Sequence, residues 1–410
     1  MLSLNISQNI LGLSNLMIKN ISTTNNLTTF EVEMIRKPHK CPCCGTMTDR
    51  IHDYRLQKIK DLPSLGKKVN LLLRKRRYVC PSCHKRFYEQ VDFLPKYHRM
   101  TSRVINEVLM LLASTHSFKS VAQQLNLSPS TVVRIFDHLS YQPSQLPRII
   151  SFDEFKGNAD GEKYQCIITD PEHHRIIDIL PNRYKSDLTS YLLKFDTSHT
   201  EIFISDMWAT YRDLAKEIFP NACYVIDKYH YIRQVIWALD AVRKEVQQEF
   251  SDYRRKYFKR SKRLLIKKFN TLDSDSMQSV NLMLYTSQKL ASAHALKEEF
   301  FEAMQSKTRL EALTSLTTWI SHAENSSLPR FVSVARTMNH WLSGILNSFE
   351  TTYTNGFTEG TNNTIKVLKR NAFGYRNFNR FRNRILHIDY AKVGRRSFHF
   401  FYLPQISCIT

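Results

Sequence analysis

The chain has no apolar run long enough to cross a membrane, which argues against a membrane as the partner of this positively charged protein. A membrane-spanning helix needs about 20 consecutive apolar residues, and no segment of this sequence approaches that length. Segment 1–20 has no basic residues ahead of its apolar ones and is interspersed with Asn and Ser, so it does not predict a signal peptide. No low-complexity tract is present. We therefore expect a cytoplasmic protein without a membrane partner.

Acidic residues are scarce for a chain of this size. Lys and Arg number 59 against 37 for Asp and Glu, which gives the 410 residues a formal net charge of +22 at pH 7. Such an excess favours a polyanionic partner, and DNA or RNA fits better than an anionic membrane. The length allows about two to four domains.

Gly and Pro are both missing between Asn221 and Leu328. Because these residues are the usual helix breakers, the gap predicts a long helical region, and we place an all-α insertion at 232–345. The expected fold class is multidomain α+β. The expected domains are an N-terminal arm and zinc-binding domain at 1–98, a helix-turn-helix at 99–140, an α/β catalytic core at 148–231 and its second part, with a basic tail, at 346–410.

The segment after Arg148 alternates between strand and helix patterns. "RIISFDEF", "KYQCIITD" and "HRIIDILP" predict three strands in an antiparallel meander. A helix follows in "SDLTSYLLKF", with Ser186 as the expected N-cap, and then a strand, a helix and a last strand, "ACYVID". Three strands followed by helix, strand, helix and strand is the order of an RNase H-like core, although other α/β folds share parts of it.

Four of the eight cysteines form two CxxC pairs, Cys41 with Cys44 and Cys80 with Cys83. Each pair can present two thiolates from a tight turn, and two such turns complete a tetrahedral Zn²⁺ site. Four thiolates leave no open position, so the zinc would be structural. Cys43 could exchange with a neighbour, although the spacing favours Cys41 and Cys44. Reduced thiols without metal are the alternative.

The segment 117–139, "SFKSVAQQLNLSPSTVVRIFDHL", fits a helix-turn-helix. Ser128 is expected to cap a second helix that starts with a proline. Exposed Ser130, Thr131 and Arg134 would then point into the major groove of DNA. A plain helical hairpin is the alternative, since short apolar patterns of this kind are common.

A basic run, Arg74, Lys75, Arg76 and Arg77, precedes the second cysteine pair. We expect it to contact DNA phosphates, with a solvated strand face as the alternative. Two further stretches mix basic and aromatic residues, 253–269 and 375–386. They are expected to position DNA through its phosphates rather than to distinguish base sequences.

Three acids lie in contexts that suit metal-dependent phosphoryl transfer. Asp153 and Asp206 each end an apolar strand-like run, and Glu359 opens an amphipathic helix. Two-metal chemistry needs hard oxygen ligands around two Mg²⁺ about 4 Å apart. In an RNase H-like sheet the first and fourth strands are neighbours, so Asp153 and Asp206 would meet. Other acids stay open as alternatives, namely Glu154, Asp170 and Asp178. Glu154 is the sharpest of these, because it is expected on the opposite strand face from Asp153.

The helix from Glu359 carries polar and basic residues at helical spacing, among them Asn362 and Asn363. The side chains of this helix that we expect to bind DNA phosphates are Asn363, Lys366, Lys369 and Arg370. Trp208, two residues past Asp206, could stack on a flipped base or simply pack in the core. Asp227 and His230 could organise the site or form a capping pair.

These motifs together resemble the DDE transposases of the ISL3 insertion-sequence family. The resemblance rests on "CPCC", "CPSC", "SFDEF", "SDMWATY", "DKYHY" and "GFTEGTNNTIKVLKRNAFGYRNFNRFRNRIL", and it covers nearly the whole chain. It implies catalytic, Mg²⁺-binding acids at Asp153, Asp206 and Glu359. It implies zinc ligands at Cys41, Cys44, Cys80 and Cys83.

The resemblance also implies an RNase H-like core interrupted by the helical insertion. The implied activity is Mg²⁺-dependent cleavage and strand transfer of double-stranded DNA, with recognition of terminal inverted repeats and of target DNA. Joining two ends would need a homodimer or a larger assembly, and the protein would be bacterial and associated with the nucleoid. The alternatives are a DNA-binding regulator without catalysis and an RNase H-like structure-specific nuclease.

Overall fold

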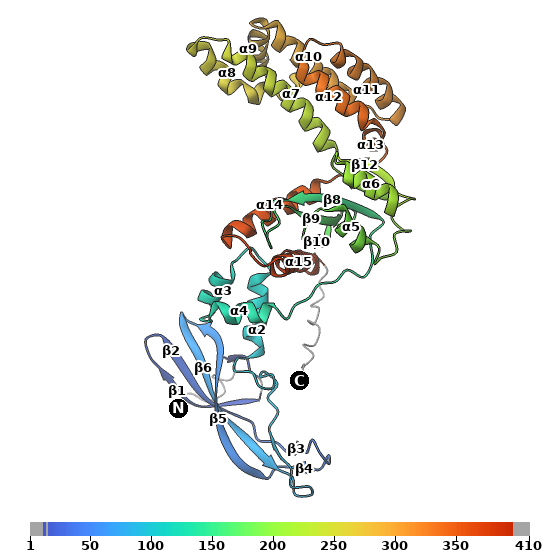
Figure 1. Cartoon of the computed structure of the whole chain (residues 1–410). Coiled ribbons are helices and arrows are strands. Elements are labelled where there is room, and N and C mark those ends of the chain that lie inside the picture. The colour runs from blue at the N-terminus through green and yellow to red at the C-terminus, as the bar shows by residue number, and fades with distance from the viewer. Residues whose placement is uncertain (1–10, 14, 397–410) are drawn as a thin grey trace. The chain divides into compact units, whose positions relative to one another are not determined.

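The computed structural model describes residues 11–13 and 15–396, and these form two compact units. One unit gathers the described residues up to Tyr141 with Val367–Phe373 and the residues from Asn383 on; the other holds Gln142–Lys366 and Gly374–Arg382. Figure 1 shows the elements of each. Among the described residues, no helix combines the length and the apolar character needed to cross a membrane.

A mixed sheet is the framework of the first unit. Its strands are β1 (Leu16–Thr23), β2 (Leu27–Met34), β5 (Ile51–Ser64), β6 (Lys67–Val79) and β7 (Arg86–Tyr88). The spatial order is β1-β2-β6-β5, with β7 also paired to β6. Long strands β5 and β6 form a hairpin, which turns at Leu65 and Gly66, both with positive φ. Within the predicted N-terminal arm, β1 and β2 pair as antiparallel strands.

Three helices of the first unit follow the sheet, α2 (Ser102–Leu112), α3 (Phe118–Gln124) and α4 (Pro129–Phe136). Helices α3 and α4 are the predicted pair. The Ser128 hydroxyl accepts a hydrogen bond from the backbone N–H of Thr131, so the predicted N-cap of α4 is confirmed. Apolar residues at helical spacing bury one side of each helix in a shared core, in which Val132 and Phe136 are fully buried.

The C-terminal part of α15 (Phe378–Arg396) completes this helical core. Buried Arg384 donates hydrogen bonds to the carbonyl oxygens of Leu112, Ser114 and His116, just where α2 ends. These carbonyls have no partner within the helix, and a guanidinium there also favours the negative end of the helix dipole. A residue 272 positions from Leu112 in sequence therefore caps α2.

The second unit contains a five-stranded sheet in the order β10-β9-β8-β11-β12. Its strands are β8 (Ile149–Phe155), β9 (Gln165–Asp170), β10 (Arg175–Leu180), β11 (Ile202–Ser205) and β12 (Cys223–Ile226). The first three form the predicted antiparallel meander, while β11 lies parallel to both β8 and β12. The predicted neighbourhood of the first and fourth strands is thereby confirmed.

Two helices connect the parallel strands, α5 (Lys185–Leu192) and α6 (Ala209–Ile218). The N-cap expected at Ser186 is wrong, because the helix already begins at Lys185 and Tyr184 occupies the cap position without a side-chain hydrogen bond. Asn182 takes part of the capping role instead, since its side-chain oxygen accepts from the N–H of Tyr184 and its amide donates to Asp187.

From Lys228 to Asn347 the regular elements are helical. They are α7 (Lys228–Gln248), α8 (Asp252–Leu265), the 3-10 turn Phe269–Thr271, α9 (Ser274–Tyr285), α10 (Gln288–Ala303), α11 (Arg309–Glu324), α12 (Pro329–His340) and α13 (Leu342–Asn347). They share one apolar core around the fully buried Trp319 and Phe300. Helix α13 packs against the edge strand β12, where a side chain in place of Gly344 would meet Ile226 at 3.0 Å.

Candidate active site

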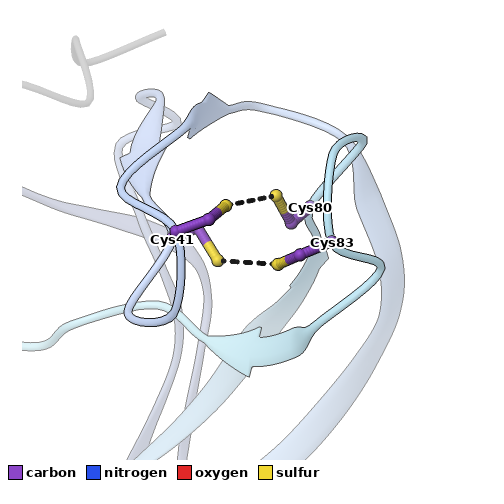
Figure 2. A group of neighbouring side chains, drawn as sticks. Cys41, Cys80 and Cys83 are labelled. Carbon is purple, nitrogen blue, oxygen red and sulfur yellow. Dashed lines mark hydrogen bonds between the residues drawn. The ribbon is translucent and has the colours of Figure 1, made fainter.

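The two CxxC pairs come together in the first unit. The sulfur atoms of Cys41 and Cys83 lie 3.6 Å apart (Figure 2). Those of Cys44 and Cys80 lie 3.4 Å apart. All four sulfur atoms lie within 4.8 Å of one another, whereas the exposed Cys43 is outside the group. A hydrogen bond with Thr46 lowers the pKa of the Cys44 thiol to about 6, which favours the thiolate. Four sulfur donors this close together fit a structural Zn²⁺.

Local backbone geometry explains why each pair presents its thiols on a tight turn. The first turn joins β3 (His39–Lys40) to β4 (Met47–Thr48), and the second joins β6 to β7. In both turns the residue after the second cysteine has a positive φ, Gly45 at 76° and His84 at 59°. Glycine adopts this conformation at no steric cost. The N–H of Gly45 also returns to the carbonyl of Cys41, and that of His84 to Cys80.

In the second unit, acidic residues from three strand ends and one helix line a cleft of about 280 Å³. Asp153 lies near the end of β8, Asp206 directly after β11 and Asp227 directly after β12. Glu359 lies in the first turn of α14 (Gly356–Asn371). The complete lining is Asp153, Glu154, Asp206, Asp227, Tyr229, His230, Arg233, Asn355, Glu359, Asn362 and Lys366. The parallel pairing of β8, β11 and β12 brings their carboxyl ends to one edge of the sheet.

Buried hydrogen bonds fix the start of α14 on this sheet. Thr358 shares a hydrogen bond of 2.7 Å with Thr169 of β9, and Asn355 accepts one of 2.5 Å from the Ser151 hydroxyl of β8. Asn355 also donates its N–H to Asp227. Glu359 and Asn362 are therefore held at the cleft by contacts at the beginning of their helix.

Burial dominates the electrostatics of the cleft. It raises the pKa of Asp153 to about 7 and that of Asp206 to about 7, and neighbouring acids add to both shifts. Three buried acceptor atoms of the cleft have no hydrogen-bond partner among the described residues, namely Asp206 Oδ1, Glu154 Oε2 and Asn362 Oδ1. Unpaired buried oxygens are costly unless a cation or a water satisfies them. The donor set thus fits hard divalent cations.

Asp153 and Glu154 differ in their partners. Asp153 accepts a hydrogen bond of 2.8 Å from the Asn362 side chain, whereas Glu154 forms an ion pair of 2.6 Å with Arg183. Both residues line the cleft, although they are neighbours on one strand. Arg183 thus compensates the charge of Glu154, whereas the side-chain partner of Asp153 is the neutral Asn362 amide.

The remaining acids differ in accessibility. Glu359 is exposed to solvent while Asp153 and Asp206 are partly covered. Among the described residues, Asp153, Asp206 and Glu359 do not form a group as tight as the four thiols. The alternative Asp170 is buried beside Arg175 and His173, and Asp178 is bound by Arg382 and Tyr191. Neither of these two lines the cleft.

Asp227 and His230, left open by the sequence, are both part of the cleft. Asp227 is buried at the N-cap of α7, and burial raises its pKa. Burial and the charge of Arg233 lower the pKa of His230 to about 4, so its imidazole is neutral at pH 7. Asn355, Tyr229 and Arg233 also line the cleft, although no sequence pattern predicted them there. An asparagine just before a helix is a signal that could have indicated Asn355.

The basic strand β6 divides into exposed and buried cations. Arg74 is exposed, and Lys75 and Arg77 are partly so. Arg76 is only 4% exposed and forms ion pairs with Glu33 and Glu89. The prediction that Arg76 contacts DNA is therefore corrected, because its guanidinium is used inside the protein.

The other predicted DNA-contacting residues lie at helix surfaces. Ser130 and Arg134 are exposed on α4, and Thr131 bonds to the Ser128 hydroxyl. On α14, Lys366 lines the cleft, Asn363 and Arg370 are exposed, and Lys369 is half-buried. Trp208 is half-buried, with its ring edge against Tyr211 and the Arg183 guanidinium over its face, and it does not line the cleft.

Parts of the predicted basic stretches lie outside the described residues. In 253–269 the side chains at positions 254, 256, 257, 259 and 260 are outside the description, as is the C-terminal tail beyond 396.

Comparison with known proteins assigns three segments in this order. Residues 37–83 match the zinc-finger of transposase IS204/IS1001/IS1096/IS1165, and residues 89–140 match the helix-turn-helix domain of transposase family ISL3. Residues 150–385 match the transposase domain model of that family.

Full-length relatives agree with these matches. The chain is 26% identical to the transposase for insertion sequence element IS1001 of Bordetella parapertussis, over 82% of this chain and 85% of that protein. It is 25% identical to the transposase for IS1557 of Mycobacterium tuberculosis, over 56% of this chain and 57% of that one. A 34% match to an ATP-dependent protease of Lactococcus lactis spans only 26% of the chain, too little to carry an argument about function.

Proposed function

Because the chain belongs to the ISL3 family of transposases, we propose that it cleaves and joins DNA at the acidic cleft, with Asp153, Asp206 and Glu359 as its metal ligands. It is a DNA-binding enzyme with a zinc ribbon and a helix-turn-helix ahead of its transposase domain. The observation that carries the proposal is the convergence of strand-end carboxylates on one cleft with unpaired buried oxygens. The strand order β10-β9-β8-β11-β12 supports an RNase H-like core, and the helices from Lys228 to Asn347 would then be its insertion.

Each cleft residue has a distinct task in this proposal. Two Mg²⁺, when bound, would lower the pKa of the attacking hydroxyl and stabilise the leaving oxygen. Asn362 orients Asp153 through its amide, while Asp206 offers an oxygen without another partner. Exposed Glu359 stands at the solvent side of the same cleft. Lys366 lines the cleft, where its positive charge would stabilise the DNA phosphate that reacts.

The proposed chemistry has two steps, a hydrolysis and a strand transfer. In the first step, a water oxygen attacks the phosphorus at the transposon end, and the P–O bond to the 3′ oxygen breaks. In the second step, the freed 3′-hydroxyl attacks a phosphodiester of target DNA and displaces another 3′ oxygen. Because burial raises the pKa values of Asp153 and Asp206 to about 7, cations would bind there in competition with protons near neutral pH.

The DNA-binding domains would select where this chemistry occurs. Ser130, Thr131 and Arg134 of α4 would contact bases in the major groove of the terminal inverted repeat. Arg74, Lys75 and Arg77 of β6 would contact phosphates. Joining two ends requires at least a dimer, and the enzyme would act in the cytoplasm on nucleoid DNA.

The test compares wild type with Asp206→Asn on labelled DNA that carries the ends flanking the reading frame. Mg²⁺ should be withheld by dialysis rather than by a chelator, because a chelator would also strip the zinc site. We expect cleavage by the wild type with Mg²⁺ only, and binding without cleavage by Asp206→Asn. Asp213→Asn on α6 is a matched control, since Asp213 is 44% exposed outside the cleft. Binding by wild type with no cleavage in any condition would leave a DNA-binding role instead.

A further inference from the structure

Helix α7 leaves the acidic cleft with an aromatic and cationic stripe along one side. Tyr229, Arg233 and Trp237 are spaced by four residues, so they lie on neighbouring turns of one helix face. The guanidinium carbon of Arg233 lies 5.0 Å from the ring centre of Tyr229 and 4.6 Å from that of Trp237. Tyr229 and Arg233 line the cleft, and Trp237 continues the stripe outward.

This stripe takes no part in the packing of the helix core. The opposite side of α7 provides the buried residues Tyr231, Val235, Leu239 and Val242. Tyr229 is 47% exposed and Trp237 is 50% exposed, which is unusual for rings of their size on a helix that has an apolar core available. The exposed rings therefore need an explanation other than packing.

Arg233 is also incompletely paired. None of the described carboxylates forms an ion pair with it, although the cleft beside it is acidic. Its Nε is buried and has no hydrogen-bond partner among the described residues. A planar guanidinium next to two exposed rings can bind a phosphate through its terminal nitrogens while the rings stack on bases.

We propose that Tyr229, Arg233 and Trp237 hold unpaired nucleotides of a DNA end beside the acidic cleft. The bases would stack on the two rings, and the phosphate between them would accept hydrogen bonds from Arg233. Stacking tolerates any base because every base has a π face. Unpaired nucleotides are the ligand rather than an intact duplex, because the faces of paired bases are covered by their neighbours. The proposal rests on the function proposed above, since it assigns these residues to the same DNA substrate.

The test measures stacking directly, with full-length protein in Mg²⁺-free buffer so that no cleavage intervenes. The probe is a DNA duplex with a single-stranded overhang that contains 2-aminopurine, whose fluorescence is quenched by stacking, and the reference is the fully paired duplex. Trp237→Ala should lose the quenching and bind the overhang probe about five- to a hundredfold more weakly. Its affinity for the paired duplex should stay unchanged. Trp237→Phe should retain much of the signal.

Two comparisons make the result decisive. Tyr285→Ala is the control variant, because Tyr285 is 91% exposed at the end of α9 and belongs to no such stripe. Arg233→Lys keeps the charge but loses the planar fork, so it should weaken overhang binding more than duplex binding. Equal quenching and equal affinity for wild type and Trp237→Ala would overturn the proposal. Quenching that depends on Trp237 in a protein that never cleaves with Mg²⁺ would support the stripe and reject the catalytic function instead.

Discussion

Asn362 of α14 donates a hydrogen bond of 2.8 Å to Asp153 at the end of β8. Asn362 is buried, and it lies one helical turn after Glu359. The contact therefore fixes the helix that carries one proposed metal ligand to the strand that carries another. It also favours the ionised form of Asp153, against the effect of burial on the pKa of that carboxyl.

Replacing Asn362 should impair catalysis without preventing folding. We expect Asn362→Ala to lower the DNA cleavage rate about ten- to a hundredfold, as is typical when a group that orients a metal ligand is removed. The free energy of unfolding should fall by about 1–3 kcal/mol, because a buried carboxylate loses its donor. Cleavage assays and thermal unfolding measure the two effects. Thr364→Ala is the neighbouring control, since Thr364 lies on the same helix and does not line the cleft; equal activity of both variants would contradict the role given to Asn362.

The raised pKa of Asp206, about 7, predicts the direction in which folding stability changes with pH. A carboxyl whose pKa is higher in the folded than in the unfolded state stabilises the fold below its unfolded value near 3.8, and this stabilisation is lost as pH rises through 7. Without Mg²⁺, Asp206→Asn should therefore unfold at a higher temperature than wild type at pH 8, and the difference should shrink as the pH falls and vanish only below about pH 4.

Mg²⁺ should reverse this order for the wild type. The ion binds the deprotonated carboxylates and therefore competes with protons. As the pH is lowered below the pKa of a carboxyl, Mg²⁺ affinity should fall about tenfold per pH unit for each proton that must leave. Thermal unfolding with and without Mg²⁺ between pH 5 and 8 measures the effect, with Asp213→Asn as control. A Mg²⁺-induced stabilisation that is the same at both pH values would contradict it.

Two neighbouring arginines of β6 should behave in opposite ways. Arg76 is buried against Glu33 and Glu89, so Arg76→Ala should cost about 3–5 kcal/mol of folding free energy, because it leaves buried carboxylates without a partner. Arg77 forms a partly exposed ion pair with Asp53, so Arg77→Ala should change stability by less than about 1 kcal/mol. It should instead lower the slope of DNA affinity against salt by about 1. Denaturant unfolding and salt-dependent binding separate the two, and a salt slope equal to wild type in Arg77→Ala would remove it from the DNA contacts.

Cys43, which lies in the first turn but outside the group of four thiols, should be dispensable for zinc binding. Cys80→Ser should lose zinc and leave the turns on either side of the site open to protease, because a structural site needs all four thiolates. Cys43→Ser should keep both zinc and protease resistance, since Cys43 is exposed outside the group. Zinc content by metal analysis and limited proteolysis give the answer. Loss of zinc from both variants would mean that Cys43 takes part in the site.

Local patterns predicted much of this protein. Apolar runs and turn residues indicated the strands from Ile149 to Ile226 in their observed order, and spacing alone indicated the four cysteines. The helix cap at Ser128 followed from its own short segment. In each case the decisive interactions join residues that are close in sequence, or obey a fixed spacing.

Features that depend on distant partners were not predictable. Four successive basic residues look alike in sequence, and only Glu33 and Glu89, 43 and 13 positions away, bury Arg76. Arg183 compensates Glu154 across 29 positions, and this pairing distinguishes Glu154 from Asp153. The start of α5 was misplaced because Asn182, outside the helix, supplies a contact that the local pattern assigned to Ser186. Such choices are set by tertiary packing rather than by propensity.

Because Arg384 caps α2 from near the end of the chain, α2 is synthesised long before its cap. A ribosome completes the segment for α2, α3 and α4 long before it reaches position 384, so the emerging helices first exist with the carbonyls of Leu112, Ser114 and His116 exposed to water. Domains commonly begin to fold as they emerge from the N-terminal end. This one acquires its last buried contacts only when translation is nearly finished. A chain that ends before position 384 therefore lacks the guanidinium that satisfies the carbonyls at the end of α2.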